Sequence, residues 1–422
     1  MFKVRFFQNQ IWKTKGDFVT SQLILANGHG IALASDSAVT MGSRRTFETS
    51  EKVYPLPLPH RLAVLHSGSV MFHGLPFGTI INEWILSLGN VQLRSVPLYV
   101  DNFKSWLQDN YLNWTNDKDL CDDMLNAFYF DFQRIWNRMK RLENPMDHAA
   151  IMEIWETEIL SAESFSEASA SERKIAETEF QRLWNDGNFS SLCIQESFEY
   201  WFDDVAESDE IVALAKKYVL TSIQSRYPGS DDGVSQLIFV GYGSKDLLPS
   251  HSSVYTYGAI SKILYLIESS VGLAYREGNG VYLIKPSGQF DAIDLFFRGY
   301  GSGFIEATKT AVSKALENVS VKDPIENEAM PDSPMNSIGS LIENSFFDYS
   351  ESTKLAGLRR TVAGMPLASL VRTARHLIGI QRLSLEIAGE LQTVGGQIDV
   401  GTITLKDGFT WIHQKDYTDF VD

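Results

Sequence analysis

The chain has 422 residues, of which 44% are apolar and 12% aromatic, and this is enough to bury the core of one to three domains. Its net charge of −16 argues against a nucleic-acid-binding protein, because such proteins present a basic face. The apolar runs are far shorter than the roughly 18 residues that a membrane-spanning helix needs, and residues 1–18 do not resemble a signal peptide. With only two cysteines, Cys121 and Cys193, the sequence predicts a cytoplasmic protein that binds neither nucleic acid nor membrane.

Residues 20–70 are predicted to be rich in β-strands. The apolar runs 21–26 and 31–35 flank a glycine-containing turn, and this arrangement predicts a β-hairpin. A further short strand is predicted over 61–65, ending before His66-Ser67-Gly68.

Helical patterns follow these strands. One is predicted between Pro76 and Gly89, and a second begins at Pro97. Proline is common at the first position of a helix, and glycine is common just after its end. From about 110 to 230 the chain is acidic and rich in aromatics at helical spacing, and it carries no catalytic motif. We expect a helical region there, with tryptophans that belong to its core: Trp136, Trp155 and Trp201.

The second half returns to mixed structure. Strands are predicted at 235–243 and 253–267, and helices at 290–299, at 304–317 and after Pro366. Residues 319–341 lack any period and are predicted to form a loop. Asp407-Gly408 predicts a closing hairpin. This order fits an α+β fold in which helices cover the outer faces of sheets.

One constellation stands out from these elements. The stretch GIALASDSAVTMG (30–42) contains Asp36-Ser37-x-x-Thr40-x-Gly42, Thr20 lies 16 positions before Asp36, and Lys52 lies 16 positions after it. Matching both spacings by chance has odds of about one in four hundred, if each residue type fills about one position in twenty. The competing interpretation is structural: Asp36-Ser37 would cap a turn, and Lys52 would lie on the surface.

These residues resemble the opening of proteasome β subunits and bacterial proteasome-like proteases, which are N-terminal-nucleophile (Ntn) hydrolases. The resemblance implies a four-layer αββα sandwich over residues 20–110 and 235–422, with 111–234 as a helical insertion. It implies that Thr20 becomes the first residue after self-cleavage, so that residues 1–19 are a propeptide. It further implies that Asp36 and Lys52 support Thr20 in catalysis.

The residue types fit that chemistry. A threonine hydroxyl is a weak nucleophile and needs a base, and an N-terminal α-amine titrates at about 8, close to cellular pH. A Lys52 ammonium would lower the pKa values of that hydroxyl and amine, and Asp36 would hold Lys52 in place and keep it charged. An aspartate at the end of a buried strand needs such a partner.

By the same resemblance, two further groups belong to the site. A glycine after the third strand supplies an oxyanion donor, and Gly68 fits with a shift of one residue. A serine in a Gly-rich turn lies near the threonine. Ser287 and Ser302 are both candidates, and Ser287 is preferred because it follows the strands soonest.

Ala38 stands where the family often has arginine, and three further departures bear on activity. Val19 precedes Thr20 where active precursors usually have glycine, and it is stiffer at the bond to be cut. Leu391 and Val394 stand where the family often has aspartate and serine before two glycines, and neither side chain can orient an amine. These departures favour a second hypothesis, an unprocessed, non-catalytic proteasome-like scaffold or binding subunit.

The sequence therefore predicts a threonine-type hydrolase of peptide or amide bonds, with the scaffold as the alternative and an amidase for small amides as a narrower one. No cofactor is expected. No metal is expected either, since His66 and His73 lack ligand spacing. The expected partner is a peptide or amide substrate, while a homo-oligomer or ring and an ATPase partner are left open.

Overall fold

A computed structural model of the chain describes most of its residues. They are 20–41, 45–47, 51–115, 128, 131–140, 148–164, 170–185, 209–225, 235–260, 263–277, 280–320, 333–388 and 394–415. The described residues divide into two compact units. Unit 1 holds those within 64–240 and 251–272, and unit 2 holds those within 20–63, 241–250 and 273–415.

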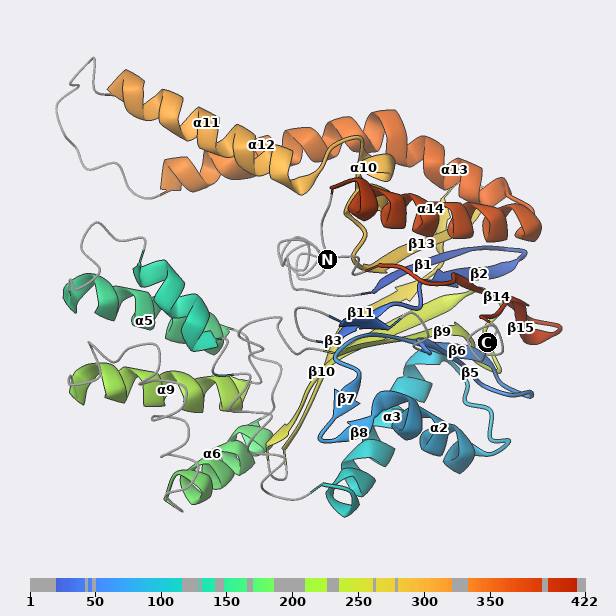
Figure 1. The fold of residues 1–422 in the computed structure, drawn as a ribbon, viewed down its shortest axis with the longest axis horizontal. Helices are drawn as coiled ribbons and strands as arrows, with labels where there is room; N and C mark the ends of the chain where they lie inside the picture. The colour runs from blue at the N-terminus through green and yellow to red at the C-terminus, as the bar shows by residue number, and fades with distance from the viewer. Residues whose placement is uncertain are drawn as a thin grey trace. The chain divides into compact units, whose positions relative to one another are not determined.

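Unit 2 is built on a six-stranded antiparallel sheet (Figure 1). Its strand order is β12-β13-β1-β2-β14-β15. In chain order these are β1 (Ser21–Asn27), β2 (Gly30–Ser35), β12 (Tyr275–Glu277), β13 (Gly280–Gly288), β14 (Asp399–Thr404) and β15 (Gly408–His413). The predicted hairpin of β1 and β2 is confirmed, and both strands are buried along their whole length because they lie at the centre of the sheet.

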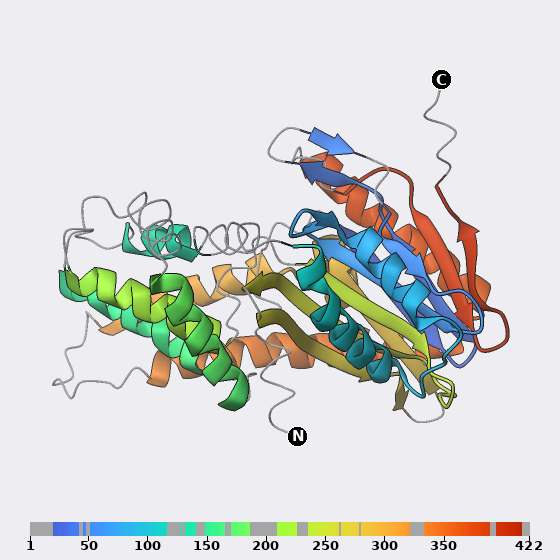
Figure 2. The same ribbon diagram turned by 90° about the horizontal axis from the view of Figure 1, so that it is seen from below.

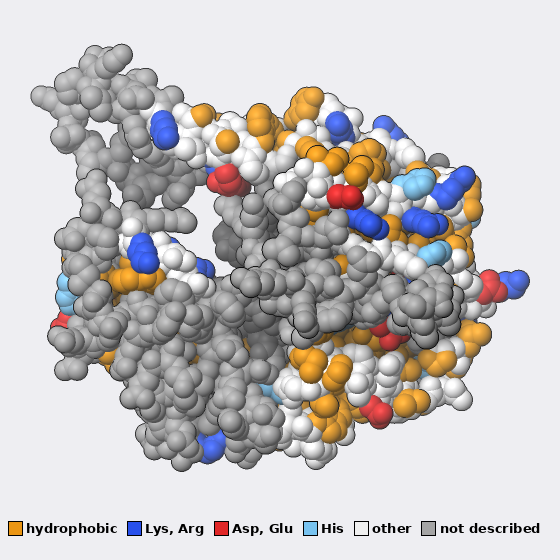
Figure 3. All heavy atoms as spheres, viewed as in Figure 1, with side chains coloured by type: hydrophobic (Ala, Val, Ile, Leu, Met, Phe, Trp, Pro, Cys, Tyr) orange, Lys and Arg blue, Asp and Glu red, His pale blue; other side chains and the backbone are white. Residues whose placement is uncertain are grey.

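Helices cover one face of this sheet (Figure 1). They are α13 (Ala356–Gly364), which packs on β13, and α14 (Leu367–Ala388), which packs on β1 and β2. The alternating residues Leu23 and Leu25 of β1 meet Leu370 and Leu377 of α14 in one core cluster. Apolar and basic side chains are mixed on the outer surface in this region (Figure 3).

Three further helices of unit 2 follow β13. They are α10 (Asp291–Arg298), α11 (Ser302–Ser320) and α12 (Ser333–Ser350), and a π-helical turn at Glu351–Leu355 joins α12 to α13. The loop predicted over 319–341 is wrong at both ends, because α11 extends to Ser320 and α12 begins at Ser333. Ser333-Pro334 is a favourable helix start that the absence of period obscured.

A five-stranded sheet contains most of the strands of unit 1. Its order is β11-β10-β9-β6-β5. The strands are β5 (Val53–Pro55), β6 (Arg61–Gly68), β9 (Ser235–Tyr242), β10 (Ser250–Ile260) and β11 (Ile263–Leu273). The stretch 253–267, predicted as one strand region, is thus divided between two antiparallel neighbours. Short strands β7 (Met71–Phe72) and β8 (Leu75–Pro76) form a hairpin of their own, as do β3 (Val39–Met41) and β4 (Arg45–Phe47) in unit 2.

The two predicted helices after β6 are confirmed as α2 (Phe77–Leu88) and α3 (Val96–Asn110), and a 3-10 turn at Tyr111–Asn113 follows α3. They pack on β9 through aromatic side chains. The rings of Trp84 and Phe103 lie 5.6 and 5.5 Å from that of Phe239. Edge and tilted contacts of this kind add to the burial of large apolar surfaces.

The acidic region between α3 and β9 contains helices α5 (His148–Ser164), α6 (Ala170–Asn185) and α9 (Asp209–Ser225), drawn in green in Figure 2. Its core includes Phe132, Trp155 and Tyr218, so the expectation for Trp155 is confirmed. Trp136 is partly buried against the same cluster, while Trp201 lies outside the described residues, as do Cys121 and Cys193. None of the described helices is both long and apolar enough to cross a membrane.

Candidate active site

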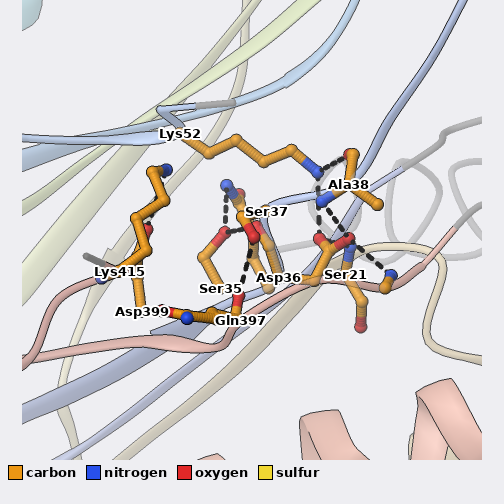
Figure 4. A network of polar contacts seen from close by, with 11 residues as sticks. Ser21, Ser35, Asp36, Ser37, Ala38, Lys52, Gln397, Asp399 and Lys415 are labelled. Atoms are coloured by element: carbon orange, nitrogen blue, oxygen red, sulfur yellow. Dashed lines mark hydrogen bonds and ion pairs between the residues drawn. The ribbon is translucent and has the colours of Figure 1, made fainter. Parts of the chain in front are cut away.

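The site is centred on Asp36, the residue that follows β2. Its side chain is 1% exposed, and it accepts hydrogen bonds from three backbone amides. The amide of Ser21 reaches Oδ1 at 2.8 Å, and the amides of Ala38 and Gly395 reach Oδ2 at 3.2 and 3.3 Å (Figure 4). The amide of Asp36 itself donates to the Ser21 carbonyl at 3.1 Å. The carboxylate is therefore fixed by the backbone of β1, of its own turn and of the segment before β14.

Lys52 lies opposite this carboxylate, directly before β5. Its Nζ is 3.0 Å from Asp36 Oδ1 and also donates to the carbonyl of Ala38. Burial raises the pKa of the Asp36 carboxyl, and the nearby Lys52 charge opposes the rise. Burial likewise lowers the pKa of Lys52, and Asp36 opposes that fall. The interpretation of Lys52 as a surface residue is thus wrong, because the ammonium is buried and paired.

Thr20 lies directly before β1 and is 3% exposed. Its carbonyl accepts a hydrogen bond from the amide of Gln289 at 2.6 Å. Gly288 has a φ of 72°, and a Cβ there would overlap the Thr20 carbonyl oxygen. The end of β13 can therefore approach Thr20 this closely because residue 288 is glycine.

The structure places the other predicted site residues as follows. Ser287 is buried on β13 and pairs with Gln22 of β1, one residue before the glycine that contacts Thr20. Ser302 instead begins α11. Gly68 ends β6 in unit 1 with a φ of 93°, and its role as an oxyanion donor stays a prediction.

Of the three positions Val19, Leu391 and Val394, the structure describes only Val394. Val394 is fully buried, whereas Leu391 and Val19 lie outside the described residues. Gly395 contributes twice, through its amide to Asp36 and through its carbonyl, which accepts from the Ser37 amide at 3.2 Å. The backbone of the glycine pair thus supports Asp36 without any help from the side chain of residue 394.

Sequence reasoning missed two lysines in this unit. Lys415, just after β15, forms a buried ion pair with Asp399 of β14, with 3.1 Å between Nζ and Oδ2. Lys285 lies on β13 two residues before Ser287, and burial lowers its pKa to about 8. The available signal was a single charged residue in each of two otherwise apolar or neutral strands, GVYLIKPSG and DVGTIT.

Chemically, the arrangement is a buried ion pair, in which the Lys52 ammonium is held by the Asp36 carboxylate and the Ala38 carbonyl. Three backbone amides fix the acceptor side, and one of them belongs to the residue after Thr20. Within the described ranges, no three His, Cys, Asp or Glu side chains are grouped as metal ligands.

Comparison with known proteins gives little beyond this geometry. No protein-family model matches the chain, and no curated protein sequence matches it. Among solved structures, it is similar to Anbu, an ancestral β-subunit from Yersinia bercovieri. The TM-score is 0.29 at 10% identity, over 94% of this chain and 89% of the other. A TM-score this low carries no assignment, so we base the proposals below on the residues of the chain itself.

Proposed function

We propose that the chain is a threonine N-terminal-nucleophile hydrolase of the proteasome-like group, which cleaves peptide or amide bonds. The observation that carries the proposal is the buried Asp36–Lys52 pair, because it is held by the amide of the residue that follows Thr20. Three residues spaced by 16 positions along the sequence are thereby gathered at one end of the β1–β2 hairpin.

In this proposal the chain is cut between Val19 and Thr20, and the freed α-amine of Thr20 is the base. The amine accepts the proton of the Thr20 hydroxyl as the oxygen attacks the substrate carbonyl, and it later returns a proton to the leaving amine. Lys52 stabilises the developing negative charge on the oxygen, and Asp36 orients Lys52. Water then hydrolyses the acyl-enzyme and frees Thr20.

Ser287 and Gly68 complete the proposed site. Ser287 is a candidate for orienting the Thr20 amine, because β13 ends beside Thr20. Gly68 would donate its amide to the oxyanion. The proposed catalytic domain is the αββα sandwich over 20–110 and 235–422, and the helical insertion over 111–234 would control access or bind a partner.

One observation favours the alternative of an unprocessed scaffold or binding subunit. Val394 is completely buried where the family often has serine, so it offers no hydroxyl to a Thr20 amine. Without cleavage after Val19, Thr20 has no free amine and therefore no base.

The deciding experiment is the intact mass and N-terminal sequence of freshly purified protein, compared with Thr20→Ala. A wild-type chain that begins at Thr20, beside an uncut variant, is the expected result. Thr310→Ala is the matched control, since Thr310 is exposed on α11, and it should be cut like wild type. A wild-type chain that retains residues 1–19 would refute the catalytic proposal for the isolated protein.

A further inference from the structure

A second lysine–aspartate pair lies next to the first one (Figure 4). Asp399 and Lys415 are 2% and 4% exposed, and Lys415 engages the carboxylate at two points. Its backbone amide donates to Oδ1 at 2.8 Å, and its Nζ donates to Oδ2 at 3.1 Å. A buried ion pair is costly to form unless its groups are well satisfied, and it is not required to fold a hairpin such as β14–β15.

The position of this pair explains what it can do. Asp399 is the direct cross-strand partner of Ser35, the residue before Asp36. The segment 394–399 runs from there along the turn that carries Asp36. Ser37 donates through its hydroxyl to the carbonyl of Gln397 at 2.8 Å, and Gly395 donates its amide to Asp36. One end of the segment is therefore anchored by Lys415, and the other end holds the Asp36 carboxylate.

We propose that Asp399 and Lys415 are positioning residues: they anchor the 394–399 segment so that the Gly395 amide stays on Asp36, and they balance the charge around Lys52. Both roles follow from the position of the second pair, which anchors the segment and also places one positive and one negative group beside the first pair. Any catalytic meaning of this arrangement rests on the proposed function, but the arrangement itself does not.

The charges near Lys52 have definite signs. After burial and Asp36, Lys415 lowers the pKa of Lys52 and Asp399 raises it. After burial, Lys415 also lowers the pKa of Glu51, the residue before Lys52, and Asp399 raises it. The two members of the second pair act in opposite directions on the pKa of Lys52. Neutralising Lys415 should therefore raise this pKa, and neutralising Asp399 should lower it.

The test uses the full chain with 13C at lysine Cε, and it follows the pH titration of Lys52 by NMR, with the signal assigned by its loss in Lys52→Arg. Lys415→Met should raise the midpoint of the Lys52 titration, and Asp399→Asn should lower it. The double variant should titrate close to wild type. Lys415→Arg, which keeps the charge, should also match wild type.

A second measurement covers the positioning role and any single variant that fails to fold. Hydrogen exchange of the peptide containing Gly395 should be at least about tenfold faster in the double variant than in Lys415→Arg, because only the double variant loses the anchor. Unchanged Lys52 titration in every variant, or unchanged Gly395 exchange in the double variant, would overturn the proposal. Neither measurement uses substrate, so a protein without hydrolytic activity would refute the proposed function and leave this inference standing.

Discussion

Removal of the Lys52 ammonium is the most direct perturbation of the site. Lys52→Met keeps an unbranched side chain of similar length, and Asp36→Asn keeps the shape of the carboxylate. The two side chains are 3% and 1% exposed, so solvent cannot replace a lost partner. Each single variant therefore leaves one buried charge without its charged partner, whereas the double variant removes both charges.

The magnitude follows from the geometry. At 3.0 Å and an effective dielectric constant of about 20, the attraction between the two groups is about 5.5 kcal/mol. Desolvation of both groups offsets much of this, and loss of one partner of a buried pair costs about 3–5 kcal/mol. Asp36 keeps three amide donors when Lys52 is replaced, so we expect Lys52→Met to cost about 3 kcal/mol. Asp36→Asn leaves the buried Lys52 ammonium without its carboxylate partner and should lower stability by about 4 kcal/mol.

The assay is a double-mutant cycle on the free energy of opening of the β1–β2 hairpin, measured by hydrogen exchange of peptides from 21–35. The double variant should cost no more than the worse single one, which gives a coupling energy of about 3 kcal/mol. Lys104→Met is the control. Lys104 and Glu268 are 3.4 Å apart but 27% and 32% exposed, so its loss should cost less than about 1 kcal/mol. If the effects of the two site variants add within about 0.5 kcal/mol, the groups are not coupled and the reasoning fails.

Three further predictions concern the surroundings of the site. Gly288→Ala should lower the melting temperature and block processing at Thr20, because of the overlap and the φ of 72°, while Gly301→Ala, with open space around it, should do neither. The pKa of Lys285 is about 8 in the folded chain and 10.5 when unperturbed, so unfolding binds protons between these values. Lys285 should then add up to about 1.4 kcal/mol per pH unit to the rise of wild-type stability over that window, and urea titrations of Lys285→Met should lack this contribution. The amide of Asn27 donates to two carbonyls at the end of α13, at 2.8 and 2.7 Å, so Asn27→Asp should melt lower than Asn27→Ala, because a carboxylate repels them.

Local patterns in the sequence were sufficient for elements that fold from neighbouring residues. Two apolar runs around Gly28-His29-Gly30 predict the hairpin of β1 and β2, and Pro76 and Gly89 predict the ends of α2. The Asp36–Lys52 pair was predicted because the sequence spacing matched a known pattern, and the structure confirms that the two groups meet. What they do together remains a proposal.

Pairings between distant segments could not be found in this way. Strand β13 lies more than 250 residues after its neighbour β1, and its sequence GVYLIKPSG contains a proline and a lysine that weaken a strand prediction. The register that puts Gly288 beside Thr20 is set by packing of the whole sheet. The partnership of Lys415 with Asp399 likewise depends on where β15 ends. Each of these contacts depends on the tertiary structure, and no local sequence pattern predicts it.

The departure at Val394 can now be weighed physically. A serine at that position would help to orient a freed Thr20 amine, whereas valine cannot. The backbone amides of Ser21 and Gly395 hold the Asp36 carboxylate in place without that serine, but they donate to Asp36 and not to a group of Thr20. Support of Lys52 by Asp36 therefore does not require a serine at position 394: the double-mutant cycle measures the coupling of Asp36 with Lys52, and the Gly395 exchange measures how firmly the backbone holds Asp36.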